Sequence, residues 1–212
     1  MSGKIFSIIL FSIIVISVSG CGTVRRITFP PEYTYFPVSN ENIGITKQYP
    51  KSYTIYPFMN TSWDQHAAKR ARMAIYKSFS LIGKTPLMSE TDRLASSPYT
   101  LADAIRVAKR EKCDAVVVGE VLEQEQSFLF LYTYNYVKVK ITIYDVRTSL
   151  PLWKGSSWGY ANEFGGLIFW IPNPILPLIK NIFWSRITMD LYNRISMDIV
   201  HSIRPDIIKI ED

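Results

Sequence analysis

The chain of 212 residues holds 24 basic and 18 acidic side chains, a formal charge of +6, and 48% hydrophobic residues. This length is enough for one domain with a real core. The basic residues are scattered rather than massed in a run, which argues against a nucleic-acid partner and leaves attraction to anionic lipid headgroups as a milder use of the charge.

The N-terminus has the form of an export signal. Lys4 gives a short basic region, and an apolar run rich in isoleucine follows from Ile5 to Val18, too short for an ordinary transmembrane helix. Ser19 and Gly20 then lead into Cys21, an order that resembles the lipobox of bacterial lipoproteins. The resemblance implies cleavage after residue 20 and a diacylglyceryl group on the Cys21 thiol. A plain secretory signal with an incidental cysteine is the alternative.

The residues after the anchor bear on location. Gly22 follows Cys21, whereas an aspartate there retains lipoproteins at the inner membrane in many bacteria. We therefore expect a lipid-anchored protein of the bacterial cell envelope, at the outer membrane and facing the periplasm. Residues 21–51 contain prolines at positions 30, 31, 37 and 50 and little periodicity. They predict a tether, part of which can pack on the surface of the domain.

Residues 52–212 predict an α/β domain of the α+β type, with a single mixed β-sheet and helices packed on it. Its first half shows a strand at 53–58, a helix at 64–82 and a short strand or extended segment at 86–88. A second helix is expected to begin after Thr100, because Thr100 and Asp103 have the Thr-x-x-acid form of a helix start.

The second half has clearer strand signals. An unbroken apolar run at 114–122 predicts a central strand covered on both faces. Alternation at 137–143 predicts a strand half exposed to solvent, which a turn at 147–151 joins to a hairpin partner at 152–160. A last helix is predicted at 185–203, before Arg204-Pro205.

Three tracts carry a resemblance to a known family: Tyr53–Ser62, Cys113–Val121, and Ile143–Thr148 with Leu152-Trp153 behind it. They resemble the CsgG-like envelope lipoproteins, which include curli-secretion lipoproteins, lipoprotein activators of penicillin-binding proteins and the N-terminal domain of the Tol-system propeller protein. The similarity spans about residues 52 to 203. One departure is Ser149-Leu150, where the family turn usually offers a glycine.

Catalytic constellations are not evident. His66 and His201 lack metal-ligand spacing, and Ser62, Asp64 and His66 are better explained by helix capping than by nucleophilic catalysis. Glu120, Glu123 and Glu125 fit a solvated strand face. Cys113 has no disulfide partner and is expected to be a small buried thiol. We expect no enzymatic activity, no metal and no cofactor.

The segment Phe164–Trp184 is apolar, with no charge before Lys180, but its prolines would break a spanning helix. Its tryptophans suit a membrane interface. We interpret it as a loop or helical hairpin that dips into one leaflet; a loop buried in the protein or in an oligomer interface is the alternative. The predicted membrane-contact residues are Phe164, Leu167, Ile168, Phe169, Trp170, Ile171, Ile175, Leu176, Leu178, Ile179, Phe183 and Trp184.

A shorter apolar stretch lies at 128–136. By the resemblance, the two stretches occupy the positions where curli-type transporters carry membrane-spanning hairpins. The leading hypothesis is a non-enzymatic, lipid-anchored periplasmic lipoprotein that binds envelope proteins, or itself, in envelope assembly or secretion. Its expected partners are lipid, through Cys21 and residues 164–184, and envelope proteins. A subunit of an oligomeric outer-membrane secretion channel is the alternative, and a hydrolase is a remote third.

Overall fold

A computed structural model describes residues 25–29, 32–35, 50–89, 100–129, 132–164 and 176–203. At several strand ends and over residues 176–186 it describes the backbone alone. The elements are β1 (Arg25–Thr28), β2 (Glu32–Tyr35), β3 (Ser52–Ile55), β4 (Met59–Asn60), α2 (Ala67–Leu81), β5 (Thr85–Met88), α3 (Leu101–Arg110), β6 (Ala115–Leu129), β7 (Tyr132–Asp145), β8 (Pro151–Phe164) and α4 (Leu176–Ser202).

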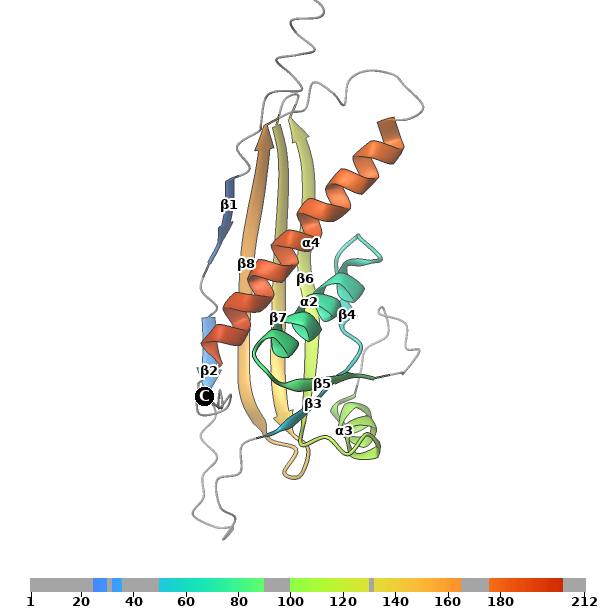
Figure 1. Ribbon diagram of the computed structural model, residues 1–212, viewed down its shortest axis with the longest axis vertical. Coiled ribbons are helices and arrows are strands. Elements are labelled where there is room, and N and C mark those ends of the chain that lie inside the picture. Colours follow the sequence, from blue (N-terminus) through green and yellow to red (C-terminus); the bar gives the residue numbers. More distant parts are fainter. Residues whose placement is uncertain are drawn as a thin grey trace, which may run out of the picture.

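The eight strands form one mixed sheet in the order β1-β8-β7-β6-β3-β5, with β2 also on β8 and β4 also on β6. Three long antiparallel strands, β6, β7 and β8, run the length of the molecule (Figure 1). The short strands β3 and β4 pair with β6 in parallel, and β5 pairs with β3 in parallel. At about 3.3 Å per residue, the 14 residues of β7 extend over roughly 45 Å. The predicted α/β fold with a single mixed sheet is confirmed.

The helices divide between the two faces of the sheet. α2 and α4 lie on one face, which we call the inner face, and α4 crosses the long strands diagonally (Figure 1). Their buried side chains, among them Ile75, Phe79 and Leu191, form the main core with Val117 and Ile141. α3 packs on the opposite, outer face at one end of the sheet.

Strand β6 is central, as its sequence predicts. Val117 faces the core under α2 and α4, while Val116 and Val118 belong to a second core with Ala104 and Ala108 of α3. A strand buried on both sides needs apolar residues at consecutive positions, which explains the unbroken valine run.

Gly119 is required by close packing on β6. A Cβ atom on this residue would lie 2.4 Å from the Phe58 ring, which is itself buried. Both residues lie in tracts that carry the family resemblance, so the resemblance here reflects one packing contact.

Several boundaries differ from those expected. α4 begins at Leu176 rather than at 185, and it includes Pro177, which a first helical turn tolerates because the early amides have no intrahelical acceptor. The long strands extend beyond their predicted ends, since each continues to pair with its neighbour. Two segments within the predicted tether, 25–28 and 32–35, pair antiparallel with β8.

In the turn after β7, Ser149 takes the conformation for which the CsgG-like turn usually offers a glycine. Ser149 has a φ of 60°, the left-handed conformation that glycine adopts without strain. The hairpin still pairs antiparallel, with Thr142 opposite Lys154 and Ile143 opposite Trp153, and its register shifts at a bulge between Ile143 and Tyr144 beside this turn.

Candidate protein-binding surface at the basic end

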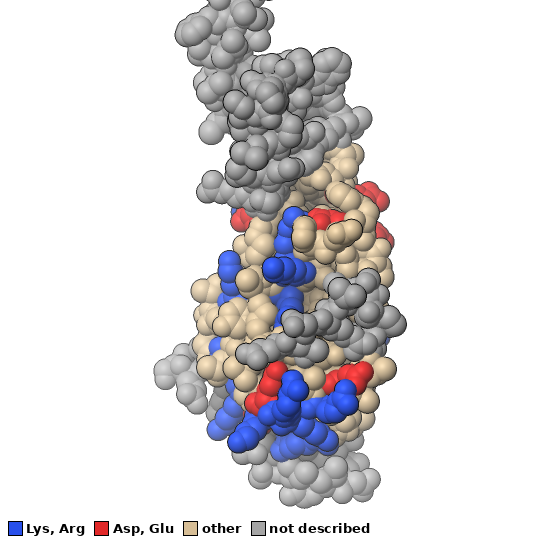
Figure 2. Space-filling model, turned by 90° about the vertical axis from the view of Figure 1, so that its right-hand side faces the viewer, with Lys and Arg blue, Asp and Glu red and all other residues tan. Residues whose placement is uncertain are grey.

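Basic side chains gather at the end of the molecule that holds α3 (Figure 2). We define the basic end by six exposed residues from three separate parts of the chain: Lys51, Arg106, Lys109, Arg110, Lys112 and Arg147. Arg106 is 78% exposed and Arg147 is 49% exposed. Arg106, Lys109, Arg110 and Lys112 lie on α3 or just after it, whereas Lys51 and Arg147 are distant in sequence. The sheet topology brings these two residues to the same end.

The first turn of α3 forms hydrogen bonds to its own acidic residue, Asp103. Thr100 Oγ1 accepts a hydrogen bond from the Asp103 amide at 3.2 Å and donates to the Asp103 carboxylate at 2.7 Å. Asp103 also accepts from the Arg106 guanidinium at 2.6 Å. This is the cap that the Thr-x-x-acid sequence predicts, and it leaves Asp103 engaged within its own helical turn.

The other end of α3 directs lysines outward. The Cys113 amide donates to the Ala108 carbonyl at 3.0 Å, and the Lys112 amide donates to Lys109 at 3.1 Å. These two bonds form a Schellman motif, in which Lys112 takes a φ of 56° where glycine is usual. Basic residues in the last helical turn also lie favourably at the negative end of the helix dipole. Cys113, buried and free, fits the expected small thiol.

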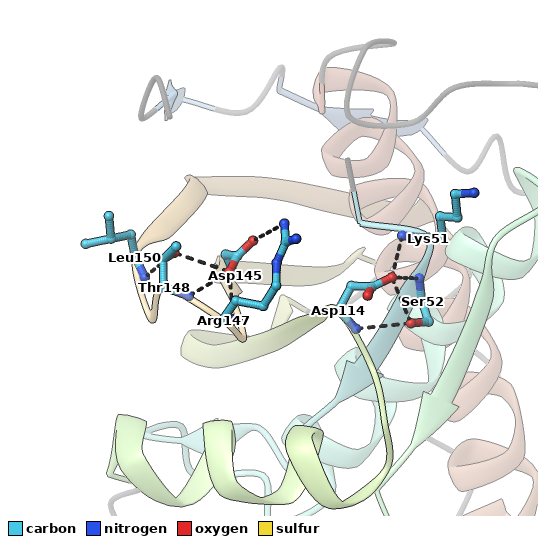
Figure 3. A network of polar contacts seen from close by, with 7 residues as sticks. All are labelled: Lys51, Ser52, Asp114, Asp145, Arg147, Thr148 and Leu150. Atoms are coloured by element: carbon cyan, nitrogen blue, oxygen red, sulfur yellow. Dashed lines mark hydrogen bonds and ion pairs between the residues drawn. The ribbon is translucent and has the colours of Figure 1, made fainter. Parts of the chain in front are cut away.

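Asp114 ties this helix end to the first core strand (Figure 3). Its Oδ2 accepts from the amides of Lys51 and Ser52 at 2.9 and 3.2 Å and from the Ser52 hydroxyl at 3.1 Å. Burial opposes ionisation of this carboxyl, but these hydrogen bonds and the positive charge of Arg147 hold its pKa below the usual value. The backbone at Lys51 is thereby fixed while its side chain points away from the network (Figure 3).

Asp145 organises the adjoining turn in the same way. Its Oδ1 accepts from the amides of Arg147 and Thr148, both at 2.8 Å, and its Oδ2 lies 3.5 Å from the Arg147 guanidinium. The Val146 amide donates to the Asp114 carbonyl at 2.9 Å, which joins the two networks. The basic end is therefore built on ordered turns, and its carboxylates are already hydrogen-bonded.

Four members of this surface form no ion pair with any described carboxylate. Within the described residues, no ion pair engages the side chains of Lys51, Lys109, Arg110 or Lys112, whereas Arg106 and Arg147 each face a carboxylate. Together they present a positive surface that is rigid in its backbone, which suits an acidic partner.

The predicted membrane residues are only partly described. Cys21 lies outside the described residues, and so do Leu167, Ile168, Phe169, Trp170, Ile171 and Ile175, which belong to the segment 165–175. Phe164 ends β8, and Leu176, Leu178, Ile179, Phe183 and Trp184 lie in the first half of α4. Among the described residues, no helix has both the length and the apolar character needed to cross a membrane. The leaflet contact stays a prediction.

The Ser62, Asp64 and His66 group serves local structure. Asp64 Oδ1 accepts from the His66 amide at 2.9 Å, and the Ser62 hydroxyl donates to Asn60. Asp64 Oδ2 accepts from Arg70 and from Gln124, at 2.7 Å for the latter. The sequence predicts helix capping by Ser62 or Asp64, but α2 begins at Ala67 after His66 and has no side-chain cap, so Asp64 instead holds the turn before the helix. The sequence does not indicate the link from Asp64 to β6.

Gln124 extends this network into the core. Its Oε1 accepts from the Tyr192 hydroxyl at 2.7 Å, and burial together with the charge of Asp64 raises the pKa of Tyr192, which keeps the phenol a donor. A bulge between Val121 and Glu123 turns Gln124 inward, so that Glu123 and Glu125 stay exposed on the outer face. No group of three metal-ligating side chains occurs in the part of the chain that the structure describes.

No protein-family model and no curated protein matches the chain. The solved PelC dodecamer from Paraburkholderia phytofirmans is similar at 14% identity, covering 84% of this chain and 96% of that chain, with a TM-score of 0.47.

Two lipoproteins are also similar in structure. Lipoprotein GNA1162 from Neisseria meningitidis is 20% identical over 65% of this chain and 98% of its own, with a TM-score of 0.44. The minor lipoprotein from Acinetobacter baumannii is 11% identical over 72% and 90%, with a TM-score of 0.38. Structures similar to this chain therefore include bacterial lipoproteins, and the specific likeness to curli-secretion lipoproteins stays a prediction.

Proposed function

We propose that this chain is a non-enzymatic, lipid-anchored envelope protein that binds an acidic partner protein through its basic end, in envelope assembly or secretion. The anchor rests on the apolar run that leads into Cys21. The binding role rests on one observation, the four exposed cations of the basic end that face no carboxylate among the described residues.

The surrounding contacts support binding over a merely solvated surface. The described carboxylates at this end already have partners. Asp103 and Asp145 accept hydrogen bonds from their own turns and pair with Arg106 and Arg147. Asp114 accepts from Lys51 and Ser52, and Glu111 accepts from the Thr54 hydroxyl. Positive charge presented on a fixed backbone raises the rate of encounter with an acidic surface and fixes the register of docking.

Site-specific photocrosslinking in intact cells tests this function. A photoreactive p-benzoylphenylalanine replaces Arg110, and in a matched control it replaces Lys77, an exposed basic residue of α2. We expect a discrete adduct from position 110 alone, and we expect Lys109→Glu with Lys112→Glu to abolish it. Equal adducts from both positions, or none from position 110, would contradict the proposed binding surface.

The channel alternative makes a different prediction for the intact protein. A secretion channel requires a closed ring of copies, so native mass spectrometry of the detergent-extracted lipoprotein would show one large oligomer. The partner-binding function predicts a monomer or small oligomer whose adduct at position 110 is heterologous. A crosslink from position 110 to another copy of this chain would favour the ring.

A further inference from the structure

Uncharged segments that are distant in sequence end at the same end of the sheet, opposite to the basic end. Leu129 ends β6 opposite Tyr132 of β7, and Tyr132 also pairs with Phe164, the last residue of β8. The first turn of α4, at Leu176, lies at the same height along the long axis (Figure 1). We call this region the apolar end. The described residues 128–129, 132–136, 164 and 176–179 at this end are uncharged, and Glu163 lies next to Phe164.

β1 begins near this same end, four residues after the proposed lipidation site Cys21. Arg25 pairs with Asn162, two residues before the end of β8. The next residues hold the strand in place, because the Phe29 amide donates to the Trp158 carbonyl and the Ser157 hydroxyl donates to the Phe29 carbonyl, both at 3.0 Å. The four residue steps from Cys21 to Arg25 can span at most about 14 Å.

Aromatic residues lie next to the apolar end on the outer face. Phe29 stacks on Trp158 with ring centroids 3.7 Å apart, Tyr136 lies 5.7 Å from Trp158, and Tyr134 lies 6.0 Å from Tyr160. All five are half-buried, and no described helix covers them. Tryptophan and tyrosine prefer the interface between a bilayer and water, where an apolar ring and a polar group are both accommodated.

Charge increases further along the same face. Lys138 lies opposite Trp158 and Glu123, and Lys140 lies opposite Glu120. Glu163 lies opposite Thr133, one residue before the end of β8. On the outer face, the strands change from uncharged residues at the tip to aromatic side chains beside Glu125, Glu123 and Lys138, and finally to the basic end. This order matches the change in polarity from a leaflet to bulk water.

We infer that the apolar end is the lipid-binding surface of the molecule and that the leaflet holding the Cys21 lipid is its partner. The inference rests on the proposed lipid anchor and deepens it: the leash is four residues long, not a tether over residues 21–51. The long axis then points away from the membrane. In this orientation the basic end lies away from the leaflet, because the long strands separate the two ends by roughly 45 Å.

The lipid on Cys21 and the apolar end then attach the molecule to the same leaflet at two neighbouring points. A single acylated cysteine leaves a domain free to tilt, whereas a second contact beside it fixes the orientation. The basic end is then held out from the membrane, where a protein partner can reach it.

Fluorescence quenching in vesicles tests the orientation. The full acylated protein, in a Cys113→Ala background, carries a fluorophore on Ser127→Cys beside the apolar end or, as the matched control, on Thr148→Cys at the basic end. It is reconstituted in phosphatidylethanolamine–phosphatidylglycerol vesicles that contain a doxyl-labelled lipid. We expect several-fold stronger quenching at position 127 than at position 148. Equal quenching at the two positions, or the reverse order, would overturn the inference.

Further variants test whether the apolar end itself binds lipid or is only kept near the membrane by the short leash to Cys21. A Gly-Ser linker inserted after Gly22 lengthens the leash, and quenching at position 127 should persist because the apolar end itself binds lipid; its loss would overturn the inference. Adding Leu129→Asp to the linker variant should remove the quenching. Protection of position 127 from aqueous iodide without quenching by the doxyl lipid would mean that another copy covers this end, and would also overturn it.

Mass spectrometry of the N-terminal peptide distinguishes the inference from the proposed anchor. Acylated Cys21 with equal quenching at both positions would contradict the lipid-binding surface and leave the anchor standing. An unmodified Cys21 in a protein that still shows stronger quenching at position 127 would contradict the anchor and leave the surface standing.

Discussion

At the scale of single residues, the contact between Gly119 and Phe58 is among the tightest in the core. A methyl group at position 119 would overlap the Phe58 ring, and both residues are enclosed by the sheet and α2. We expect Gly119→Ala to reduce the free energy of unfolding by about 1–3 kcal/mol, the usual cost of overpacking a core. Urea denaturation followed by circular dichroism measures this change.

The control removes the opposing ring. In a Phe58→Ala background the same Gly119→Ala substitution fills space instead of overlapping an aromatic side chain, so its cost should largely disappear. A cost that is unchanged in that background would mean that the strand backbone, not the ring, requires glycine.

A second residue-scale prediction concerns pH and Asp64. Burial raises the pKa of this carboxyl, but bonds from the His66 amide, Gln124 and Arg70 outweigh it and leave the pKa below its usual value. A carboxyl with a lowered folded-state pKa stabilises the fold above its unfolded pKa of about 3.9, and this contribution is lost as pH falls through the folded value. Acid should therefore destabilise the protein partly through Asp64.

Unfolding of Asp64→Asn at two pH values checks this. At neutral pH the variant should lose about 2 kcal/mol of unfolding free energy, since hydrogen bonds to a charged group are weakened. Near pH 3 the difference from the parent should shrink, because the parent carboxyl is then becoming protonated. Glu125→Gln, at an exposed position, serves as the control and should change little. A difference that is the same at both pH values would contradict the prediction.

At the scale of elements, two helices end in the same motif with different residues. Gly83 follows α2 with a φ of 75°, and Lys112 follows α3 with a φ of 56°. In each motif, the amide of the next residue donates a hydrogen bond to a carbonyl of the last helical turn. Lys84 donates to Phe79, and Cys113 donates to Ala108. The left-handed conformation costs a side-chain-bearing residue about 1–2 kcal/mol, while glycine loses somewhat more backbone entropy on folding.

Lys112→Gly should therefore raise the free energy of unfolding by about 0.5–1 kcal/mol. The converse change, Gly83→Ala, is the matched control and should lower it by a similar amount, with open space around the added methyl excluding a clash. Thermal unfolding monitored by circular dichroism measures both. A loss of stability in Lys112→Gly would mean that the lysine side chain contributes a contact that outweighs the backbone strain.

The helices and strands also show which features of the fold can be predicted from local sequence patterns. The inward positions of the helices, such as Phe79 and Leu191, and the doubly buried valines of β6 could be predicted because burial imposes a period on local sequence. The start of α4 and the pairing of β1 and β2 could not, since proline is tolerated in a first turn and edge strands depend on a distant partner. The basic end likewise requires the long-range pairing that places Arg147 beside Asp114.

At the scale of the whole molecule, the sheet has two outer edges that are protected differently. β5 forms one edge, where it is short and contains Pro86, a residue that cannot donate to another strand. β8 would form the other edge along 14 residues, but β1 and β2 pair with it there. The segment that contains β1 and β2 therefore has a structural task of its own, the cover of the β8 edge.

Removing that cover should make the protein self-associate. Replacing residues 25–35 with a Gly-Ser segment of equal length would expose the amides and carbonyls of a long edge strand, which readily pair with another chain. We expect the variant to elute as larger species in size-exclusion chromatography with light scattering, at concentrations where the parent does not. Glu32→Ala with Thr34→Ala is the control, because both side chains are exposed and the backbone pairing is retained. An unchanged mass for the replaced segment would mean that β8 does not need β1 and β2 as its cover.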